Sequence, residues 1–285
     1  MKLKRYMIHC QDIDVRVTEW GERDKPVIFC LHGLGSTALS FIEVADKLQY
    51  DFRILAIDAP GHGMSQSFQN EHAYDFPRFC EWLNQVLDML DVNRFYFLSH
   101  SWGSFIHLYY LIDQGDRVDG SILIDGGYQS KRLRGRSSEK EAAYYETDFE
   151  VFCETWGEFE SMAVYDGISR RSPLLDLAAQ DLAVHRDNRY YWHARGKTGA
   201  AIIRSMYRDE VLDFSSRVQS NSIILLRATL PEADEPFKID ASNQIAELTG
   251  AVVKPVPSAS HMLHWENPDR VVQEIKENWV TSVSV

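Results

Sequence analysis

The feature that most constrains the fold of this 285-residue chain is a repeated order of apolar strand, glycine-bearing loop and amphipathic helix. Residues 26–31 and 52–57 are short, almost continuous apolar runs, as expected for strands buried on both faces. After each glycine-bearing loop, apolar residues recur at helical spacing, for example from Phe41 to Leu48. This alternation predicts an α/β fold with a mostly parallel, doubly wound sheet and helices on both faces.

The alternation of strands and helices continues along the chain, whereas its first residues show a different pattern. Residues 6–10 and 13–20 alternate apolar and polar side chains, which predicts an antiparallel hairpin at a sheet edge. Further buried strands are expected at 94–98, 118–124, 222–228 and 251–256, with helices at 79–90, at 239–248 and from Asn267-Pro268 onward.

Between Tyr128 and about Ser220 the alternation stops. The charged stretch 131–140 is followed by many aromatic residues at mainly helical spacing, and no strand pattern of comparable quality appears. We therefore expect an all-helical cap, residues 128–220, inserted between two core segments, residues 1–127 and 221–285. Most of its aromatic residues should form the cap's own core, and a few should line a pocket.

Composition and charge narrow the range of partners and compartments. A net charge of −12 argues against nucleic acid or an anionic membrane as a partner, and no apolar run is long enough to span a bilayer. The four cysteines show no paired spacing, which favours free thiols in a reducing compartment. We expect a cytoplasmic monomer or homodimer that acts on a small molecule.

The run Ser99-His100-Ser101-Trp102-Gly103 joins a predicted strand directly to a helical pattern. A serine flanked at two residues on either side by small residues, at a strand-to-helix junction, is typical of a nucleophile elbow. The flanking residues must be small because the turn folds back tightly, and Ser99 stands where glycine is more usual. The turn would expose the Ser101 hydroxyl at the carboxyl end of the sheet.

Other polar residues also follow predicted strands. His32, Asp58 and Asp125 each come directly after an apolar strand, as Ser101 does. Ligands of parallel sheets bind beyond the carboxyl ends of the strands, so these four positions predict one shared site.

Four motifs, in this order, make the chain resemble the α/β-hydrolase fold over essentially its whole length. They are His32-Gly33-Leu34-Gly35, Asp58-x-x-Gly61-His62-Gly63-x-Ser65, Ser99-x-Ser101-x-Gly103 and Ser260-His261-Met-Leu-His264. The resemblance implies that Ser101 is the nucleophile and His261 its general base. It also implies an oxyanion hole made by the backbone N–H groups of Leu34 and Trp102.

The resemblance assigns other roles to the remaining histidines of these motifs. His264 lies near His261 but at the entrance to a helix, and is the less favoured base. His62 and His100 match positions that are usually structural. His32 is expected to shape the oxyanion loop and to take no part in proton transfer.

The third member of the triad is where the sequence departs from the family pattern. The usual position of the acid, after the strand that precedes the last one, is occupied by Pro231. Asp234 precedes His261 by an interval close to the usual one and is the first choice. Asp125, at the end of the strand before the insertion, is the second choice, because some relatives carry their acid there. Glu232 is the third.

These assignments predict a serine hydrolase, most simply a carboxylesterase, that cleaves a small to medium, largely apolar ester through an acyl-enzyme. Neither metal-ligand spacing nor a glycine-rich phosphate loop is evident, so no cofactor and no metal are expected. Serine at the elbow speaks against dehalogenase and epoxide hydrolase activity, since such relatives use aspartate there.

Two alternatives to an esterase remain open. One is a C–C bond hydrolase or an aminopeptidase of the same fold, for which acidic cap residues such as Glu154, Glu158 and Glu160 would hold a substrate amine. The other is a non-catalytic receptor or signalling partner with the same fold. The displaced acid is the feature that favours this second alternative.

Overall fold

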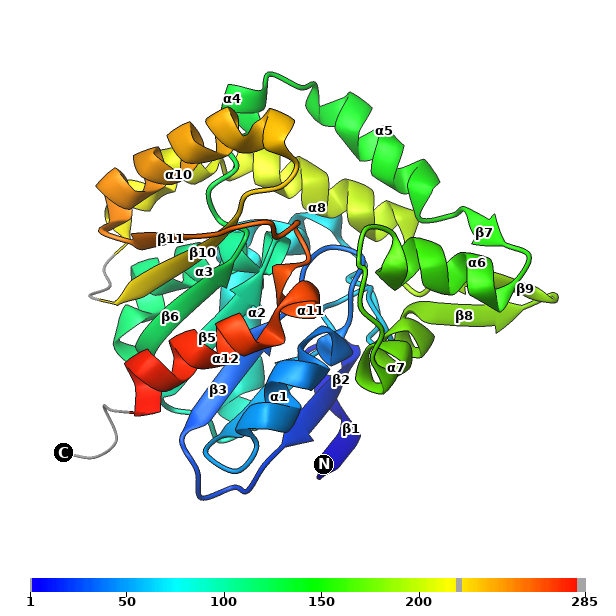
Figure 1. Cartoon of the computed structure of the whole chain (residues 1–285), viewed down its shortest axis with the longest axis horizontal. Helices are drawn as coiled ribbons and strands as arrows, with labels where there is room; N and C mark the ends of the chain where they lie inside the picture. The colour runs from blue at the N-terminus through cyan, green and yellow to red at the C-terminus, as the bar shows by residue number, and fades with distance from the viewer. Residues whose placement is uncertain (1, 219–221, 281–285) are drawn as a thin grey trace.

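An eight-stranded sheet forms the centre of the computed structural model, which describes residues 2–218 and 222–280 (Figure 1). The strand order is β1-β2-β4-β3-β5-β6-β10-β11. β2 is antiparallel to both its neighbours, and every pair from β4 to β11 is parallel. The bounds are β1 (Leu3–Cys10), β2 (Ile13–Trp20), β3 (Val27–Leu31), β4 (Arg53–Ile57), β5 (Phe95–His100), β6 (Val118–Ile124), β10 (Ile223–Ala228) and β11 (Val252–Val256). The predicted parallel sheet with an antiparallel hairpin at one edge is confirmed.

Helices cover both faces of this sheet, as the apolar runs predict. Within β3, Ile28 and Cys30 contribute to the buried cluster on one face, while Phe29 and Leu31 contribute to the cluster on the other. Helices α1 and α12 pack in the first cluster, and α2, α3 and α10 pack in the second. Their bounds, with the short α11, are α1 (Ile42–Leu48), α2 (Phe76–Met89), α3 (Trp102–Gln114), α10 (Glu235–Thr249), α11 (Leu263–Glu266) and α12 (Pro268–Ile275).

Local sequence signals set where several of these helices begin. Pro77, Pro236 and Pro268 lie in the first turns of α2, α10 and α12, where the missing N–H removes no helical hydrogen bond. The Asn267 side chain accepts a hydrogen bond from the backbone N–H of Arg270 at 3.1 Å and so caps α12. The predicted helix start at Asn267-Pro268 is confirmed. None of the described helices has the length and apolarity that crossing a bilayer requires.

The segment between β6 and β10, called the cap here, combines helices with a small sheet, so the prediction of an all-helical cap is wrong. Its helices are α4 (Lys131–Arg134), α5 (Ser138–Asp148), α6 (Trp156–Glu160), α7 (Pro173–Leu182), α8 (Gly196–Arg208) and α9 (Val211–Phe214). Strands β7 (Phe152–Cys153), β8 (Ala183–Arg186) and β9 (Arg189–Trp192) form an antiparallel sheet in the order β7-β9-β8.

The hairpin between β8 and β9 explains the missed strands. Asp187 and Asn188 form its two-residue loop, and both have positive φ, at 50° and 57°. Two left-handed residues match the twist of a tight hairpin, and Asp and Asn tolerate that conformation better than most residues. Strands this short give too few positions for an alternating pattern to be recognised.

The predicted cap boundary at 220/221 lies outside the described residues.

Charge and burial both tie the cap to the core. The Asp181 carboxylate on α7 accepts hydrogen bonds from Arg5 of β1 at 2.7 Å and from Arg16 of β2 at 2.9 Å. Arg16 also donates to Asp58, after β4, at 2.5 Å. Trp265 of α11 is buried within the cap's own apolar cluster. In Figure 1 the cap accordingly lies over the carboxyl ends of the central strands.

Candidate active site

The turn between β5 and α3 has the strained geometry expected of a nucleophile elbow. Ser101 adopts φ 51° and ψ −121°, a conformation that residues with a side chain rarely take. The space around it explains the need for small neighbours. A Cβ on Gly103 would lie 2.4 Å from the Leu31 carbonyl oxygen, and one on Gly126 would lie 2.2 Å from the Ser101 carbonyl oxygen. The elbow therefore fits between β3 and the end of β6 only with glycine at both positions.

Ser99 occupies the other small position of the elbow, and its hydroxyl is satisfied by a buried polar group. The Ser99 hydroxyl lies 3.0 Å from the Ser104 hydroxyl and 2.8 Å from His107 Nδ1. The second ring nitrogen, His107 Nε2, lies 2.9 Å from the Ser121 hydroxyl. Burial of a serine in place of glycine therefore leaves no polar atom of this group without a partner.

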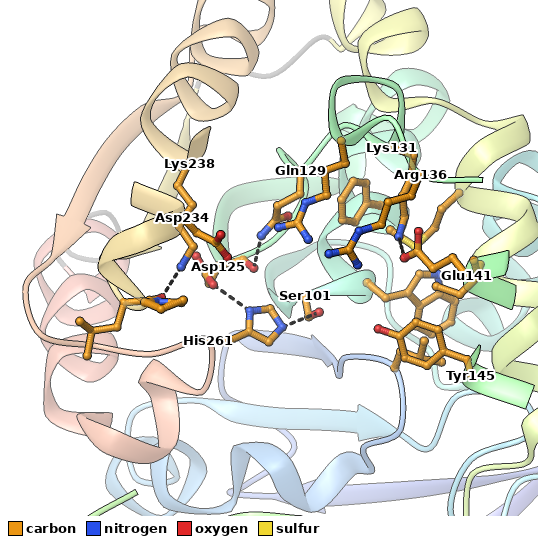
Figure 2. Close-up of a pocket in the computed structure, with 18 residues that line it drawn as sticks. Ser101, Asp125, Gln129, Lys131, Arg136, Glu141, Tyr145, Asp234, Lys238 and His261 are labelled. Atoms are coloured by element: carbon orange, nitrogen blue, oxygen red, sulfur yellow. Dashed lines mark hydrogen bonds and ion pairs between the residues drawn. The ribbon is translucent and has the colours of Figure 1, made fainter. Parts of the chain in front are cut away.

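Two short hydrogen bonds join Ser101, His261 and Asp125 (Figure 2). The Ser101 hydroxyl lies 2.8 Å from His261 Nε2, and His261 Nδ1 lies 2.7 Å from Asp125 Oδ2. Because an ionised carboxylate only accepts hydrogen bonds, Nδ1 is assigned the proton and Nε2 accepts from the serine. The imidazole is therefore held in the tautomer that a base for Ser101 needs.

Asp125 is fixed by contacts on both of its carboxylate oxygens. Oδ2 accepts from His261, while Oδ1 accepts from the Tyr128 hydroxyl at 2.7 Å and from the Ala228 backbone N–H at 3.0 Å. Burial favours the neutral acid, but the hydrogen bond from His261 and the nearby charge of Lys238 outweigh it and keep the pKa of Asp125 below its usual value. Asp125 is thus an ionised and well-oriented partner for His261.

This geometry corrects the ranking of the three candidate acids. Asp125, the second choice from sequence, contacts His261, whereas no hydrogen bond joins His261 to Asp234 or Glu232 in the described structure. Asp234 lies at the start of α10 on the cavity wall, and Pro231 lines the same wall. Strand β10 holds Asp125 in place for this contact. The Asp125 backbone N–H donates to the Leu226 carbonyl, and its carboxylate accepts from the Ala228 N–H, two residues farther along the same strand.

The proposed oxyanion loop is shaped by His32. The Ala59 backbone N–H donates to His32 Nε2 at 2.9 Å, so Nδ1 carries the proton and donates to the Gly33 carbonyl at 2.7 Å. Burial lowers the pKa of His32 to about 4, which keeps this ring neutral. Since the C=O and N–H of one peptide point in opposite directions, the Leu34 N–H is directed away from His32.

The second predicted donor comes from the elbow itself. Trp102 is the first residue of α3, so its N–H has no acceptor within the helix. Leu34 and Trp102 line the same cavity as Ser101 and His261. A negatively charged oxygen next to Ser101 would also meet the positive end of the α3 dipole.

The other histidines of the motifs are buried and hold neighbouring elements in place. His100 Nε2 lies 3.0 Å from the His261 carbonyl oxygen and fixes the backbone of His261. His264 Nε2 lies 2.8 Å from the Ser40 hydroxyl, and His62 stacks on Trp102 with ring centroids 6.0 Å apart. Burial lowers the pKa values of His62 and His264 to about 3, as expected for neutral structural rings.

A cavity of about 260 Å³ adjoins Ser101 and His261. The cap contributes Tyr145, Ile203 and Met206 to its wall. The acidic residues that favoured an aminopeptidase lie elsewhere. Glu158 caps α6 with Thr155, Glu160 pairs with Arg171 at 2.8 Å, and Glu154 pairs with Arg189 at 3.3 Å; none of the three glutamates lines this cavity.

Sequence reasoning missed several charged residues of the cavity. Lys131, Arg134 and Arg136 line it from the segment directly after β6, and Lys238 lines it from α10. Four cations within residues 131–136 are a visible signal, but charge alone does not indicate that they face a cavity. The missed partner of Asp125, Tyr128, lies three residues after it in the sequence.

Comparisons with known proteins agree with this geometry. Residues 26–268 match the model of the alpha/beta hydrolase fold family. A human serine hydrolase-like protein is 33% identical over 106 residues, covering 37% of this chain and 52% of that protein. A haloalkane dehalogenase from Psychrobacter cryohalolentis is 30% identical over 110 residues, covering 38% of this chain and 36% of that protein. The matched region thus spans about half or less of these curated relatives.

Solved structures show the same fold at low identity. The crystal structure of E-2-(acetamidomethylene)succinate hydrolase superposes with a TM-score of 0.78 at 18% identity, covering 97% of this chain and 99% of that one. A thioesterase domain from the curacin biosynthetic pathway gives a TM-score of 0.77 at 17% identity, covering 97% and 100%. Because the family model matches most of the chain, residues 26–268, the chain belongs to the α/β hydrolase fold family.

Proposed function

We propose that this protein is a serine hydrolase that cleaves a carboxylic ester or a related acyl bond through a covalent acyl-enzyme. The observation that carries the proposal is the pair of hydrogen bonds from Ser101 to His261, at 2.8 Å, and from His261 to Asp125, at 2.7 Å. A serine hydroxyl is a weak nucleophile near neutral pH, and this arrangement supplies the base that it needs.

The chemistry then proceeds in two balanced steps. Ser101 Oγ attacks the acyl carbon while its proton passes to His261 Nε2, and the carbonyl oxygen becomes an oxyanion held by the Leu34 and Trp102 N–H groups. His261 returns the proton to the leaving group as that bond breaks. A water molecule then attacks the acyl-enzyme by the same route, releasing the acid and restoring the Ser101 hydroxyl.

The alternatives have lost the features that favoured them. The aminopeptidase alternative relied on Glu154, Glu158 and Glu160, and these three glutamates are engaged away from the cavity. The receptor alternative relied on a displaced acid, but Asp125 is in contact with His261. C–C bond hydrolysis would use the same triad and is distinguished from ester cleavage by its substrate.

The decisive test combines active-site labelling with turnover. Wild-type protein should react with a fluorophosphonate probe at Ser101, detected by peptide mass, and should hydrolyse short 4-nitrophenyl esters. Ser101→Ala should abolish labelling and reduce kcat by a factor of about 10³ or more. Ser137→Ala is a matched control, because this exposed serine caps α5 without a side-chain hydrogen bond.

Two outcomes would count against the proposal. Unchanged turnover in Ser101→Ala would place the nucleophile elsewhere. Absence of both labelling and hydrolysis in the wild-type protein, across esters, amides and diketones, would favour the non-catalytic alternative.

A further inference from the structure

The cavity beside Ser101 has a strongly basic wall. Lys131, Arg134 and Arg136 all line it, and they lie within six consecutive residues of the segment that follows β6. In Figure 2, Lys131 and Arg136 lie on one side of Ser101, while Asp234 lies on the opposite side. Such a wall is unexpected for the largely apolar ester that the sequence suggested.

The charges on this wall are not equally neutralised. Lys131 forms an ion pair with Glu141, which also accepts a hydrogen bond from the Tyr207 hydroxyl at 2.8 Å. Lys131 is therefore held by partners from the cap itself. The neighbouring Arg132 pairs with Asp213 at 2.6 Å and does not line the cavity.

Among the described residues, neither Arg134 nor Arg136 forms an ion pair with a carboxylate, although Glu141 lines the same cavity and the charge of Arg136 helps to lower its pKa. The Arg134 guanidinium lies over the Phe237 ring of α10, 5.1 Å from its centroid. Stacking on one face leaves the N–H groups at the edge of the guanidinium available to a ligand.

The backbone between the two arginines is also fixed. Gly135 adopts the left-handed conformation, φ 63° and ψ 21°, that ends α4. The Arg136 carbonyl oxygen lies 3.0 Å from the Tyr207 hydroxyl, which shares its single proton between this carbonyl and Glu141. This sharp turn allows residues on both sides of the glycine to line one cavity. An anion bound in this part of the cavity would be attracted by both positive charges.

We propose that Arg134 and Arg136 form a subsite for an anionic oxygen group of the substrate. Resting on the proposed function, this means that the preferred substrate is an ester or thioester that carries a carboxylate or phosphate group away from the bond that is cleaved. Guanidinium groups match such groups with paired hydrogen bonds. Asp234 on the opposite wall would repel the anion and so favour its position on the arginine side.

The test uses matched substrates that differ only in charge. One pair carries the charge in the acyl part, namely mono-4-nitrophenyl adipate and its methyl ester. The other carries it in the leaving group, namely 4-acetoxybenzoate and its methyl ester. We expect the wild-type protein to prefer the charged member of at least one pair in kcat/KM. In the double variant Arg134→Gln/Arg136→Gln, that charged-to-neutral ratio should fall by about tenfold or more, mainly through KM.

Arg132→Gln is the matched control, because it removes a charge from the same segment on the side away from the cavity. It should leave the charged-to-neutral ratio within about twofold of wild type. Competitive inhibition of neutral-ester hydrolysis by hexanoate and by pentyl phosphate identifies the anion, since the tighter inhibitor names the preferred group. Both inhibitors should weaken in the double variant.

The outcomes separate this inference from the proposed function. Hydrolysis of the neutral esters without any preference for charge, or a preference that survives in the double variant, would overturn the anionic subsite alone. If no ester is cleaved, titration of Ser101→Ala with hexanoate and pentyl phosphate still decides. Binding that depends on the two arginines supports the subsite, and no binding of either anion overturns it.

Discussion

At the scale of single residues, Asp125 combines backbone strain with full satisfaction of its side chain. Its φ of 40° is uncommon for an aspartate, yet its carboxylate accepts three hydrogen bonds and its carbonyl accepts a fourth from Gln129. The three hydrogen bonds to the carboxylate fix its direction relative to His261. Orientation of the base is what a triad acid contributes, so this residue should matter more for kcat than for stability.

Asp125→Asn should reduce kcat by a factor of about 10³–10⁴, because an amide at this position no longer selects the His261 tautomer that accepts from Ser101. Asp234→Asn, the matched control at the first choice from sequence, should retain kcat within about threefold, since Asp234 makes no hydrogen bond to His261. Steady-state hydrolysis of a neutral ester measures both. A larger loss in Asp234→Asn than in Asp125→Asn would return the acid to Asp234.

The sequence indicated which serine and histidine meet, but not which acid joins them. Ser101 was predictable because the elbow requires small residues at fixed, local positions. Asp125 depends on partners far along the chain, with the Ala228 N–H 103 residues away and His261 136 residues away. Spacing within a single loop cannot report such contacts, which explains why the sequence placed Asp234 ahead of Asp125.

At the scale of secondary-structure elements, the elbow depends on how closely α3 approaches β3. Gly103 lies in the first turn of α3, and a Cβ there would meet the Leu31 carbonyl at 2.4 Å and the His32 carbonyl at 2.7 Å. Both atoms belong to the backbone of the strand and its loop, so no side chain can turn aside. The clash is relieved only if α3 moves away from β3. Any such shift would also displace the Trp102 N–H from the position that an oxyanion needs.

Gly103→Ala should therefore lower the free energy of unfolding by about 1–3 kcal/mol and slow fluorophosphonate labelling of Ser101. Gly157→Ala in α6 is the control, since a Cβ there meets nothing within 4 Å. That substitution should change stability by less than about 1 kcal/mol and leave labelling unaltered. Urea unfolding followed by tryptophan fluorescence measures the first quantity. Equal effects of the two substitutions would refute the close-approach argument.

The elements of the core were predicted from sequence far better than those of the cap. Strands such as β3 and β4 are buried on both faces, and a strand buried in this way requires a continuous apolar run that is easily recognised in the sequence. The cap strands have two to four residues, and their side chains are half-buried or exposed. Their only clear signal is the Asp187-Asn188 turn, and it concerns two residues.

At the scale of the whole molecule, the core contains several histidines that are completely shielded from water. Burial lowers the pKa values of His32, to about 4, and of His62 and His264, to about 3, and holds those of His100 and His107 well below the usual range. In the unfolded chain the same groups take up protons near pH 6.5. Below that pH the unfolded state therefore binds more protons than the folded state, and stability must fall as the pH falls.

We expect the free energy of unfolding to change little between pH 8 and pH 6.5 and to decrease steeply from pH 6.5 to pH 5. Each buried histidine contributes a slope of up to about 1.4 kcal/mol per pH unit in that range. His264→Asn removes one such group and should flatten the slope by about that amount. His9→Asn should not flatten it, because the His9 side chain is 66% exposed. Urea titrations at the three pH values measure the slopes, and parallel profiles for the two variants would show that buried histidines do not govern acid stability.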